Sequence, residues 1–181
     1  MSDERAFIPL AIAILTVSDT RSLEDDRSGA VLVERLTANG HRLADRQIVT
    51  DDVDAIQAAV QDWCHRTDVD VVITTGGTGF TGRDVTPEAL EPLFEKRMEG
   101  FSTVFHRISY DKIGVSTIQS RATGGVINAT FVFALPGSPG ACRDGWDHIL
   151  EPQLDYRHKP CNFVEIMPRL DEHLRRGGRS T

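Results

Sequence analysis

The sequence predicts a single α/β domain built around a mostly parallel, doubly wound sheet. Three observations lead to this prediction. Apolar, strand-like runs alternate with segments of helical spacing, polar or glycine-rich loops follow the strands, and 181 residues suit one compact core. No segment is biased enough in composition to indicate a linker, a repeat or a coiled coil, and flexible segments are expected only at the two ends.

The first third of the chain contains two strand–helix units. Residues 10–17 form a near-continuous apolar run, the pattern of a strand buried on both faces of a parallel sheet. Apolar residues at helical spacing follow and stop at Gly40, a typical C-terminal glycine. Residues 41–49 predict the second strand, and another helical pattern begins after Asp51 and Asp52.

The third predicted strand leads directly into a glycine-rich loop. Residues 69–74 are the strand and residues 75–79, Thr-Gly-Gly-Thr-Gly, begin the loop. A helix follows, with Thr86 predicted as its N-cap and Pro87 as its first residue. Asp26 is likewise expected to cap the first helix, without a chemical role.

The remaining elements are a helix, a strand and a second helix. The first helix is predicted from the spacing of Phe101, Val104, Phe105 and Ile108. Its apolar face is expected to pack into the core, with a subunit contact as the alternative. Residues 131–135 predict the last strand, followed by the loop 136–140 and a helix over 141–150.

Composition excludes several classes of function. A net charge of −7 argues against a nucleic-acid groove, although it permits a small polyanion held by backbone N–H groups, arginines and a captured cation. The longest apolar stretch, residues 7–17, is too short and interrupted to be an anchor or signal peptide. Cys64, Cys142 and Cys161 lack a metal-ligand pattern, so we expect packing thiols in a reducing cytoplasm.

Three polar loops are expected at one edge of the sheet. They begin at Ser18 and Asp19 after the first strand, cover 75–82 after the third, and cover 136–140 after the last. In open parallel sheets, ligands bind beyond the carboxyl ends of the strands, where glycines let phosphate oxygens approach backbone N–H groups. The sequence therefore predicts a phosphate or nucleotide site at this edge.

Two aspartates and two arginines are candidates for that site. Asp51 and Asp84 lie near predicted strand ends, where they could hold a Mg²⁺ that bridges phosphate oxygens. Arg83 and Arg121 could bind phosphate through bidentate contacts. For each aspartate alone, a loop or capping role is at least as common. The six histidines show no metal-ligand spacing and receive no metal or catalytic role.

The loop also fits a dinucleotide-binding fingerprint formally. Residues 77–82 match G-x-G-x-x-G, which keeps a nicotinamide-dependent oxidoreductase open as an alternative. That fingerprint belongs to the first strand–helix turn and opens directly into a helix, whereas this loop continues through residues 83–85. No lysine follows the glycines as in a P-loop, and no G-x-S-x-G elbow is present in the loop 136–140.

Several motifs taken together resemble one known family. They are Thr74–Gly79, Arg83–Ala89, Ser120-Arg121 and Leu135–Gly137. In this order they are similar to the MoaB/Mog family of molybdenum cofactor biosynthesis proteins, over approximately residues 8–163. The ending at 157–163 resembles the MoaB branch. The resemblance implies a domain over 8–163, a flexible N-terminus over 1–7 and a C-terminal tail over 164–181.

The resemblance implies a three-layer α/β/α molybdopterin-binding fold and adenylylation of molybdopterin with Mg-ATP. Asp51 and Asp84 match the acidic positions associated with Mg²⁺ and catalysis. Together with the loop residues above, the predicted substrate and nucleotide site contains Ser18, Asp19, Gly76, Gly77, Thr78, Gly79, Arg83, Glu88, Ser120, Arg121, Pro136, Gly137 and Ser138.

Relatives of this kind imply a homo-oligomer, either a trimer or a hexamer made as a dimer of trimers, with other enzymes of the pathway as further partners. The main functional alternative is a non-catalytic pterin-binding or scaffolding oligomer. Aspartate at both acidic positions, Asp51 and Asp84, favours the enzyme.

Overall fold

Six strands form one mixed sheet in the computed structural model, which describes residues 5–173. The strands are β1 (Ala11–Val17), β2 (Arg42–Val49), β3 (Val71–Thr75), β4 (Lys96–Arg97), β5 (Thr123–Ile127) and β6 (Thr130–Leu135). Their spatial order is β2-β1-β3-β6-β5-β4. The first four are parallel to one another, whereas β5 is antiparallel to both of its neighbours. The predicted mostly parallel sheet is confirmed.

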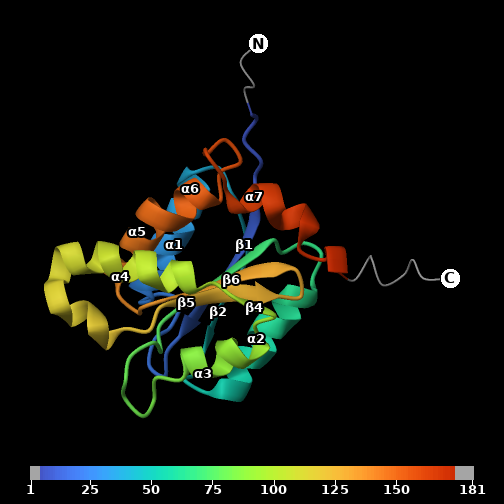
Figure 1. The fold of residues 1–181 in the computed structure, drawn as a ribbon. Helices are drawn as coiled ribbons and strands as arrows, with labels where there is room; N and C mark the ends of the chain where they lie inside the picture. The colour runs from blue at the N-terminus through green and yellow to red at the C-terminus, as the bar shows by residue number, and fades with distance from the viewer. Residues whose placement is uncertain (1–4, 174–181) are drawn as a thin grey trace.

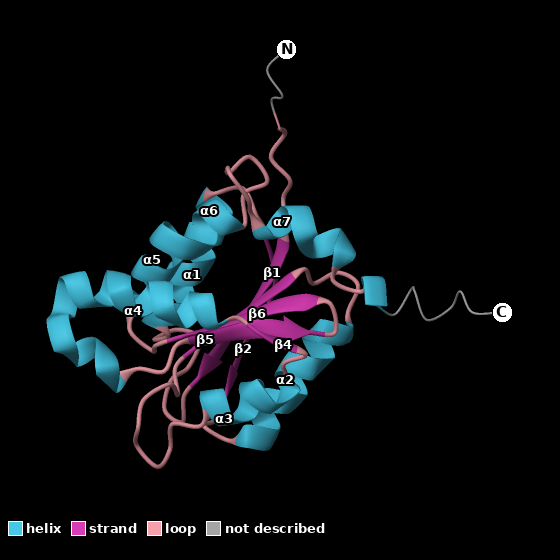
Figure 2. Cartoon of the chain, in the orientation of Figure 1, coloured by secondary structure: helices cyan, strands magenta, loops and turns pink. Residues whose placement is uncertain are grey.

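Helices cover both faces of this sheet (Figures 1 and 2). The α-helices are α1 (Arg27–Ala38), α2 (Val53–His65), α3 (Thr86–Leu90), α4 (Glu99–Ile113), α5 (Pro139–Gly145), α6 (Glu151–Gln153) and α7 (Phe163–Ile166). Shorter helical turns are η1 (Glu91–Leu93), η2 (Gly114–Gln119) and η4 (Met167–Arg169), and a π-helical turn, η3 (Trp146–Leu150), continues α5. In Figure 1, α1, α4 and α5 lie on one side of the sheet and α2 and α3 on the other.

Strand β1 shows why the fold has three layers. Ile12 and Ile14 point into the core beneath α1, α4 and α5, and Ala13 and Leu15 point into the core beneath α2 and α3. All four side chains are fully buried. Burying each of the three larger side chains, Ile12, Ile14 and Leu15, contributes about 1.5–3 kcal/mol, so a strand that is apolar on both faces is stable only between two helical layers.

The two predicted helix caps had different outcomes. Asp26 caps α1 as predicted, because its carboxylate accepts a 2.9 Å hydrogen bond from the N–H of Gly29. The prediction for Thr86 was wrong, since Val85 holds the N-cap position and Thr86 is the first residue of α3. The buried Thr86 hydroxyl donates instead to the carbonyl of Gly76 at 2.8 Å, which ties the helix to the glycine loop.

The burial of the apolar residues of helix α4 is only partly as predicted. Phe101 and Phe105 are buried in the core, as their spacing predicted. Val104 is 44% exposed, so the prediction that it packs into this core was wrong. Its side chain lines a separate pocket of about 400 Å³ together with Phe101 and Ile149. The antiparallel strands β4 and β5, which the sequence pattern did not predict, lie beside this helix at the edge of the sheet.

The segments at the two ends are anchored where the structure describes them. Arg5 forms an ion pair with Glu165, and the ring of Phe7 lies 5.1 Å from that of His41. Val164 of α7 is buried, one residue beyond the predicted end of the domain. The outer parts of the predicted flexible N-terminus and tail, 1–4 and 174–181, lie outside the described residues.

Two of the three thiols are core residues. Burial raises the pKa of Cys64 to about 12 and that of Cys142 to about 11, so both remain protonated at neutral pH. Cys161 is exposed, and the prediction that it packs in the interior was wrong. Among residues 5–173, no helix is long and apolar enough to cross a membrane.

Candidate functional site

Three loops meet at the carboxyl ends of β1, β3 and β6, which are neighbours in the sheet. Together with the start of α1 and the loop after β2, they enclose a small pocket of about 220 Å³. Its lining residues are Thr16, Val17, Ser18, Arg21, Ser28, Asp51, Thr75, Gly76, Gly77, Asp84 and Gly137. We call this the aspartate pocket. The sequence predicted six of these residues: Ser18, Asp51, Gly76, Gly77, Asp84 and Gly137.

The glycine loop at this pocket depends on two consecutive glycines. Gly76 and Gly77 have φ values of +102° and +64°, which side-chain-bearing residues rarely adopt. A Cβ atom on Gly76 would lie 2.3 Å from the carbonyl oxygen of Val17, and one on Gly77 would lie 2.4 Å from the hydroxyl of Thr86. The main chain can therefore pass this close to β1 and α3 only because both positions are glycine.

The two aspartates of the pocket differ in their electrostatics. Burial and the neighbouring carboxylates of Asp19 and Asp84 raise the pKa of Asp51 above its ordinary value. Burial alone would raise the pKa of Asp84 too, but hydrogen bonds from the Thr81 hydroxyl at 2.6 Å and N–H at 2.9 Å lower it below that value. Asp84 is therefore ionised at neutral pH, and its negative charge disfavours ionisation of Asp51.

Asp19 and Arg83 form the outer rim of the pocket. The guanidinium of Arg83 donates to both carboxylate oxygens of Asp19, at 2.7 and 2.8 Å, and lowers the pKa of that carboxyl. Asp19 also accepts a 3.0 Å hydrogen bond from the N–H of Asp51. Arg83 is therefore paired with a carboxylate in the described structure, and its contact with a phosphate stays a prediction.

The donor set of the aspartate pocket fits Mg²⁺ better than a metal that needs a full protein cage. Among the described residues, no three His, Cys, Asp or Glu side chains come together as a metal site. Mg²⁺ usually binds through one or two carboxylates, retained waters and substrate phosphates. Asp51 and Asp84 provide two such carboxylates, and the pocket lining has one arginine, Arg21, beside them.

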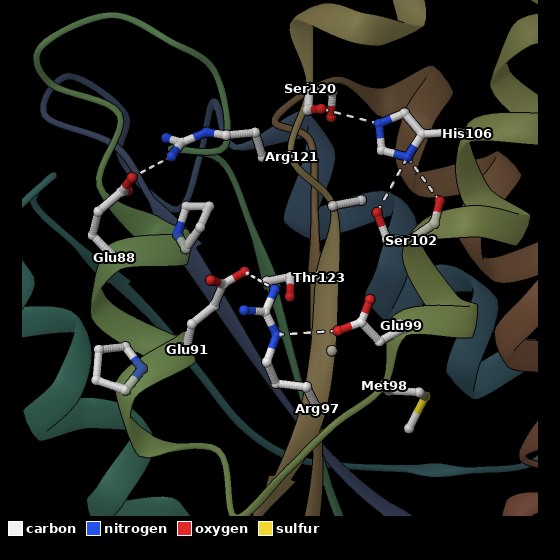
Figure 3. A pocket seen from close by; sticks show the side chains of 14 residues that line it. Glu88, Glu91, Arg97, Met98, Glu99, Ser102, His106, Ser120, Arg121 and Thr123 are labelled. Carbon is white, nitrogen blue, oxygen red and sulfur yellow. Dashed lines mark hydrogen bonds and ion pairs between the residues drawn. The ribbon is translucent and has the colours of Figure 1, made fainter.

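A second, larger pocket of about 590 Å³ holds three other predicted residues, Glu88, Ser120 and Arg121 (Figure 3). We call it the edge pocket, because α3, η1, β4, α4 and β5 surround it. Its further lining residues are Pro87, Glu91, Pro92, Arg97, Met98, Glu99, Ser102, His106, Ala122, Thr123 and Gly124. The structure therefore divides the predicted site residues between two pockets.

The charged side chains of the edge pocket are paired with one another. Glu88 forms an ion pair with Arg121, and Glu91 accepts from Arg97 at 3.0 Å. Glu99 lies 3.9 Å from the same Arg97 guanidinium. By contrast, the hydroxyl oxygen of Ser120 is buried and has no hydrogen-bond partner. A polar ligand could satisfy this hydroxyl without separating any ion pair.

The remaining predicted residues support the loops and line neither of these two pockets. Ser138 caps α5 by accepting a 3.1 Å hydrogen bond from the N–H of Ala141. The carbonyl of Thr78 accepts from the N–H of Arg121 at 2.9 Å, and that of Gly79 accepts from its guanidinium. The carbonyl of Pro136 accepts from the Thr75 hydroxyl at 3.0 Å.

Sequence reasoning missed several lining residues of both pockets. In the aspartate pocket, Ser28 at the start of α1 donates to the carbonyl of Gly137 at 3.1 Å. Its place directly after the capping Asp26 and Arg27 was an available signal, because the first turn of a helix that follows a parallel strand faces the ligand edge. Arg97 in the edge pocket had no such signal, since β4 was not predicted, and His106 lies on the predicted helix α4 but faces a pocket that the sequence did not predict.

Comparison with known proteins gives the same assignment from independent evidence. Residues 13–156 match the family model described as "Probable molybdopterin binding domain". The chain is 52% identical over 157 residues to molybdenum cofactor biosynthesis protein B of Escherichia coli K12, covering 87% of this chain and 92% of that protein. It is 44% identical over 142 residues to the protein of the same name from Bacillus subtilis, covering 78% and 84%.

Solved structures of proteins from this family superpose on the chain. A crystal structure of a molybdenum cofactor biosynthesis protein B superposes with a TM-score of 0.83 at 41% identity, covering 93% of this chain and 99% of that one. The tungsten cofactor synthesizing protein MoaB from Pyrococcus furiosus superposes with a TM-score of 0.65 at 31% identity, covering 95% and 98%. The sequence motifs, the sheet topology and these likenesses together show that the chain belongs to the MoaB/Mog family of molybdenum cofactor biosynthesis proteins.

Proposed function

We propose that this protein binds molybdopterin and adenylylates it with Mg-ATP, releasing pyrophosphate. The observation that carries the proposal is the pair Asp51 and Asp84, which line one pocket at the carboxyl ends of the parallel strands. Family membership supports molybdopterin as the substrate, and the two aspartates support phosphoryl chemistry, because a cation held there would neutralise phosphate oxygens.

The proposed reaction needs no nucleophile from the protein. A terminal phosphate oxygen of molybdopterin forms a bond to the α-phosphorus of ATP, while the bond from that phosphorus to the oxygen bridging the β-phosphate breaks, and pyrophosphate leaves. Asp51 and Asp84 would hold Mg²⁺, which when bound supplies neutralising charge to the phosphates. The glycine loop lets the phosphates approach backbone N–H groups, and the protein's main contribution is in-line positioning.

The sizes of the two pockets suggest how the substrates are divided between them. The aspartate pocket, at about 220 Å³, is smaller than the 300–1,000 Å³ typical of sites for whole ligands, whereas the edge pocket has about 590 Å³. We assign reacting phosphates to the aspartate pocket and the pterin ring system to the edge pocket. Ring N–H and carbonyl groups there would meet Glu91, Arg97 and the unpartnered hydroxyl of Ser120.

The test is an assay of purified protein with molybdopterin, ATP and Mg²⁺ that follows both pyrophosphate and adenylylated molybdopterin. Asp51→Asn and Asp84→Asn keep side-chain shape and remove charge, and each is expected to lower turnover at least about 100-fold. Asp52→Asn is the matched control, because Asp52 is an adjacent exposed carboxylate that only caps α2 and asparagine caps equally well. Full activity of Asp84→Asn would refute the mechanism.

A non-catalytic carrier or scaffold is the outcome if molybdopterin binds and no product forms under conditions in which an active relative works. The predicted homo-oligomer, a trimer or hexamer, is part of the same proposal. Its support is a group of exposed apolar side chains at the end of α4 and on η2, namely Tyr110, Ile113, Val115 and Ile118. Light scattering is expected to give a mass of three or six chains, and Ile118→Asp is expected to reduce it.

A further inference from the structure

We propose that His106 is a positioning residue for Asp84, acting through Ser120 and Arg121, although it lines the edge pocket and not the aspartate pocket. This inference deepens the proposed function and rests on it where magnesium is concerned. No histidine received a role from the sequence, because none has metal-ligand spacing; the role of His106 follows from a hydrogen-bonded path through the structure.

The path begins with the contacts of the His106 ring, which joins α4 to the chain that leaves η2 (Figure 3). Its Nε2 lies 3.0 Å from the carbonyl oxygen of Ser120. Its Nδ1 faces Ser102, one helical turn earlier, with the carbonyl at 2.7 Å and the hydroxyl at 3.3 Å. A ring protonated at Nε2 donates to the carbonyl of Ser120 and one protonated at Nδ1 donates to that of Ser102, so only a ring protonated at both nitrogens donates to both. The path to Asp84 uses the hydrogen bond from Nε2 to Ser120.

The next residue, Arg121, continues the path into the glycine loop. Its N–H donates to the carbonyl of Thr78 at 2.9 Å. Its guanidinium donates to the carbonyl of Gly79 at 2.6 and 2.9 Å and to the carbonyl of Asp84 at 3.1 Å. One planar side chain therefore joins residues at both ends of the segment 79–84. Arg121 also pairs with Glu88, which fixes the direction from which its guanidinium approaches.

The segment 79–84 in turn sets the direction of the Asp84 carboxylate. That carboxylate accepts from the N–H of Thr81 at 2.9 Å and its hydroxyl at 2.6 Å, and the N–H of Asp84 donates back to the carbonyl of Thr81 at 3.0 Å. A displacement of Arg121 would release both ends of this turn. Partners that orient a metal-binding carboxylate in this way typically change metal affinity 10–100-fold when removed.

The chain offers a matched control for His106. His65 makes the same contact within its own helix, with Nδ1 at 2.6 Å from the carbonyl of Gln61, but it lies exposed at the end of α2. His65→Ala therefore removes an imidazole and its intrahelical contact without affecting the path to Asp84. His106→Gln is the conservative variant, because its amide N–H can still donate to the carbonyl of Ser120.

The first measurement is amide hydrogen exchange of residues 79–84, which needs neither substrate nor turnover. His106→Ala is expected to raise exchange at Thr81 and Asp84 at least about tenfold, with strands β1 and β3 unchanged. His106→Gln and His65→Ala are expected to exchange like the unmodified protein. Unchanged exchange at 79–84 in His106→Ala overturns the proposal, as does a rise throughout the chain, since that would reveal only a global structural role.

The second measurement is the Mg²⁺ concentration for half-maximal adenylylation. Molybdopterin is kept saturating, because His106 also lines the edge pocket assigned to the pterin. His106→Ala is then expected to raise the Mg²⁺ concentration for half-maximal turnover about tenfold, and His106→Gln is expected to restore it. A loss of kcat that Mg²⁺ does not recover contradicts the positioning role. If the unmodified protein shows no turnover, the proposed function fails, and the exchange result still decides whether His106 orders the turn that holds Asp84.

Discussion

The aspartate pocket and the edge pocket lie at neighbouring parts of one sheet and differ in how their charges are balanced. The lining of the aspartate pocket has two carboxylates, Asp51 and Asp84, and one arginine, Arg21. In the edge pocket, Glu88 and Glu91 are each paired with an arginine. This difference in charge balance is the reason we propose a cation in the first pocket and the pterin ring system in the second.

The two pockets also differ in what supports them. The aspartate pocket adjoins a buried ion pair in which Asp26 accepts hydrogen bonds from Thr16 at 2.7 Å and from Arg46 at 2.9 Å. The edge pocket relies on partly exposed pairs such as Arg97–Glu91, with the arginine 54% exposed. Buried pairs are costly to break and exposed pairs contribute little, so substitutions at equivalent charges should have very different effects on the two pockets.

The largest effect is expected from Asp26→Ala. It leaves Arg46 unpaired and removes the cap of α1, which should lower the free energy of unfolding by about 3–5 kcal/mol. The exposed cap Asp52→Ala is the control, with an expected loss of about 1 kcal/mol. Urea denaturation measures both changes, and equal losses would contradict the contrast between buried and exposed support.

The same substitution should alter the pH dependence of stability. Burial alone would raise the pKa of Asp26, but hydrogen bonds from Thr16, Gly29 and Arg46 lower it below its ordinary value. The stability from this carboxylate is therefore complete above the pKa of the unfolded chain and is lost as the pH falls through the lowered folded pKa. Asp26→Ala is expected to lack that acid-dependent component.

A smaller loss of stability, with a large loss of activity, is expected from Gly77→Ala. An alanine at φ +64° costs about 1–2 kcal/mol, and its Cβ would lie 2.4 Å from the Thr86 hydroxyl and 3.0 Å from the Asp51 carboxylate. Turnover should fall at least about 100-fold because the catalytic geometry shifts. Gly82→Ala, where nothing lies within 4 Å, should behave like the unmodified protein in both assays.

Asp51→Asn is expected to have the opposite effect on stability from the two substitutions above, because it should stabilise the metal-free protein. With its pKa raised by burial and by Asp19 and Asp84, the ionised form costs stability above that pKa, and the cost disappears as the pH falls through it. At neutral pH a rise in Tm of about 1–2 °C is expected, together with loss of Mg²⁺ binding. The exposed Asp54→Asn should not raise Tm; if it does, general charge reduction is the cause.

The smallest change in stability is expected in the edge pocket. Arg97→Ala removes an exposed ion pair worth about 0–1 kcal/mol, so Tm should change little. Affinity for molybdopterin, followed by quenching of its fluorescence, should fall several-fold because a lining cation is lost. Arg107→Ala on the exposed side of α4 serves as the control. Equal affinities of the two variants would remove the edge pocket from the proposed pterin site.

The two pockets also differ in how well the sequence predicted them. Strands β1, β2, β3 and β6 were predicted within about two residues. For β1, β3 and β6 the signal was an apolar run followed by a polar loop, whereas β2 is a partly buried strand of mixed polarity. The loops after β1, β3 and β6 contain most of the correctly predicted lining residues of the aspartate pocket. Their meeting in space followed from the rule that parallel strands place their carboxyl ends at one edge.

The edge pocket was not predictable as a separate site, since it depends on elements without a local signature. Strand β5 reads Thr-Gly-Gly-Val-Ile, and β4 has two exposed residues. The reason for Gly125 is tertiary, because a Cβ there would lie 2.5 Å from the ring of Phe94. Tertiary contacts also decide the role of Thr86, because its hydroxyl donates to the carbonyl of Gly76 and does not cap the helix as predicted.

The Arg121 contacts to carbonyl groups have a consequence for protein engineering. The guanidinium binds main-chain oxygens of Gly79 and Asp84 and lies 5.2 Å from the centre of the Phe80 ring, while the Thr81 hydroxyl donates to the Asp84 carboxylate. Closure of the loop therefore uses the side chains of Phe80 and Thr81, whereas Gly82 has open space around it. Position 82 can be randomised in a library to change substrate preference at the mouth of the site while the loop backbone is retained.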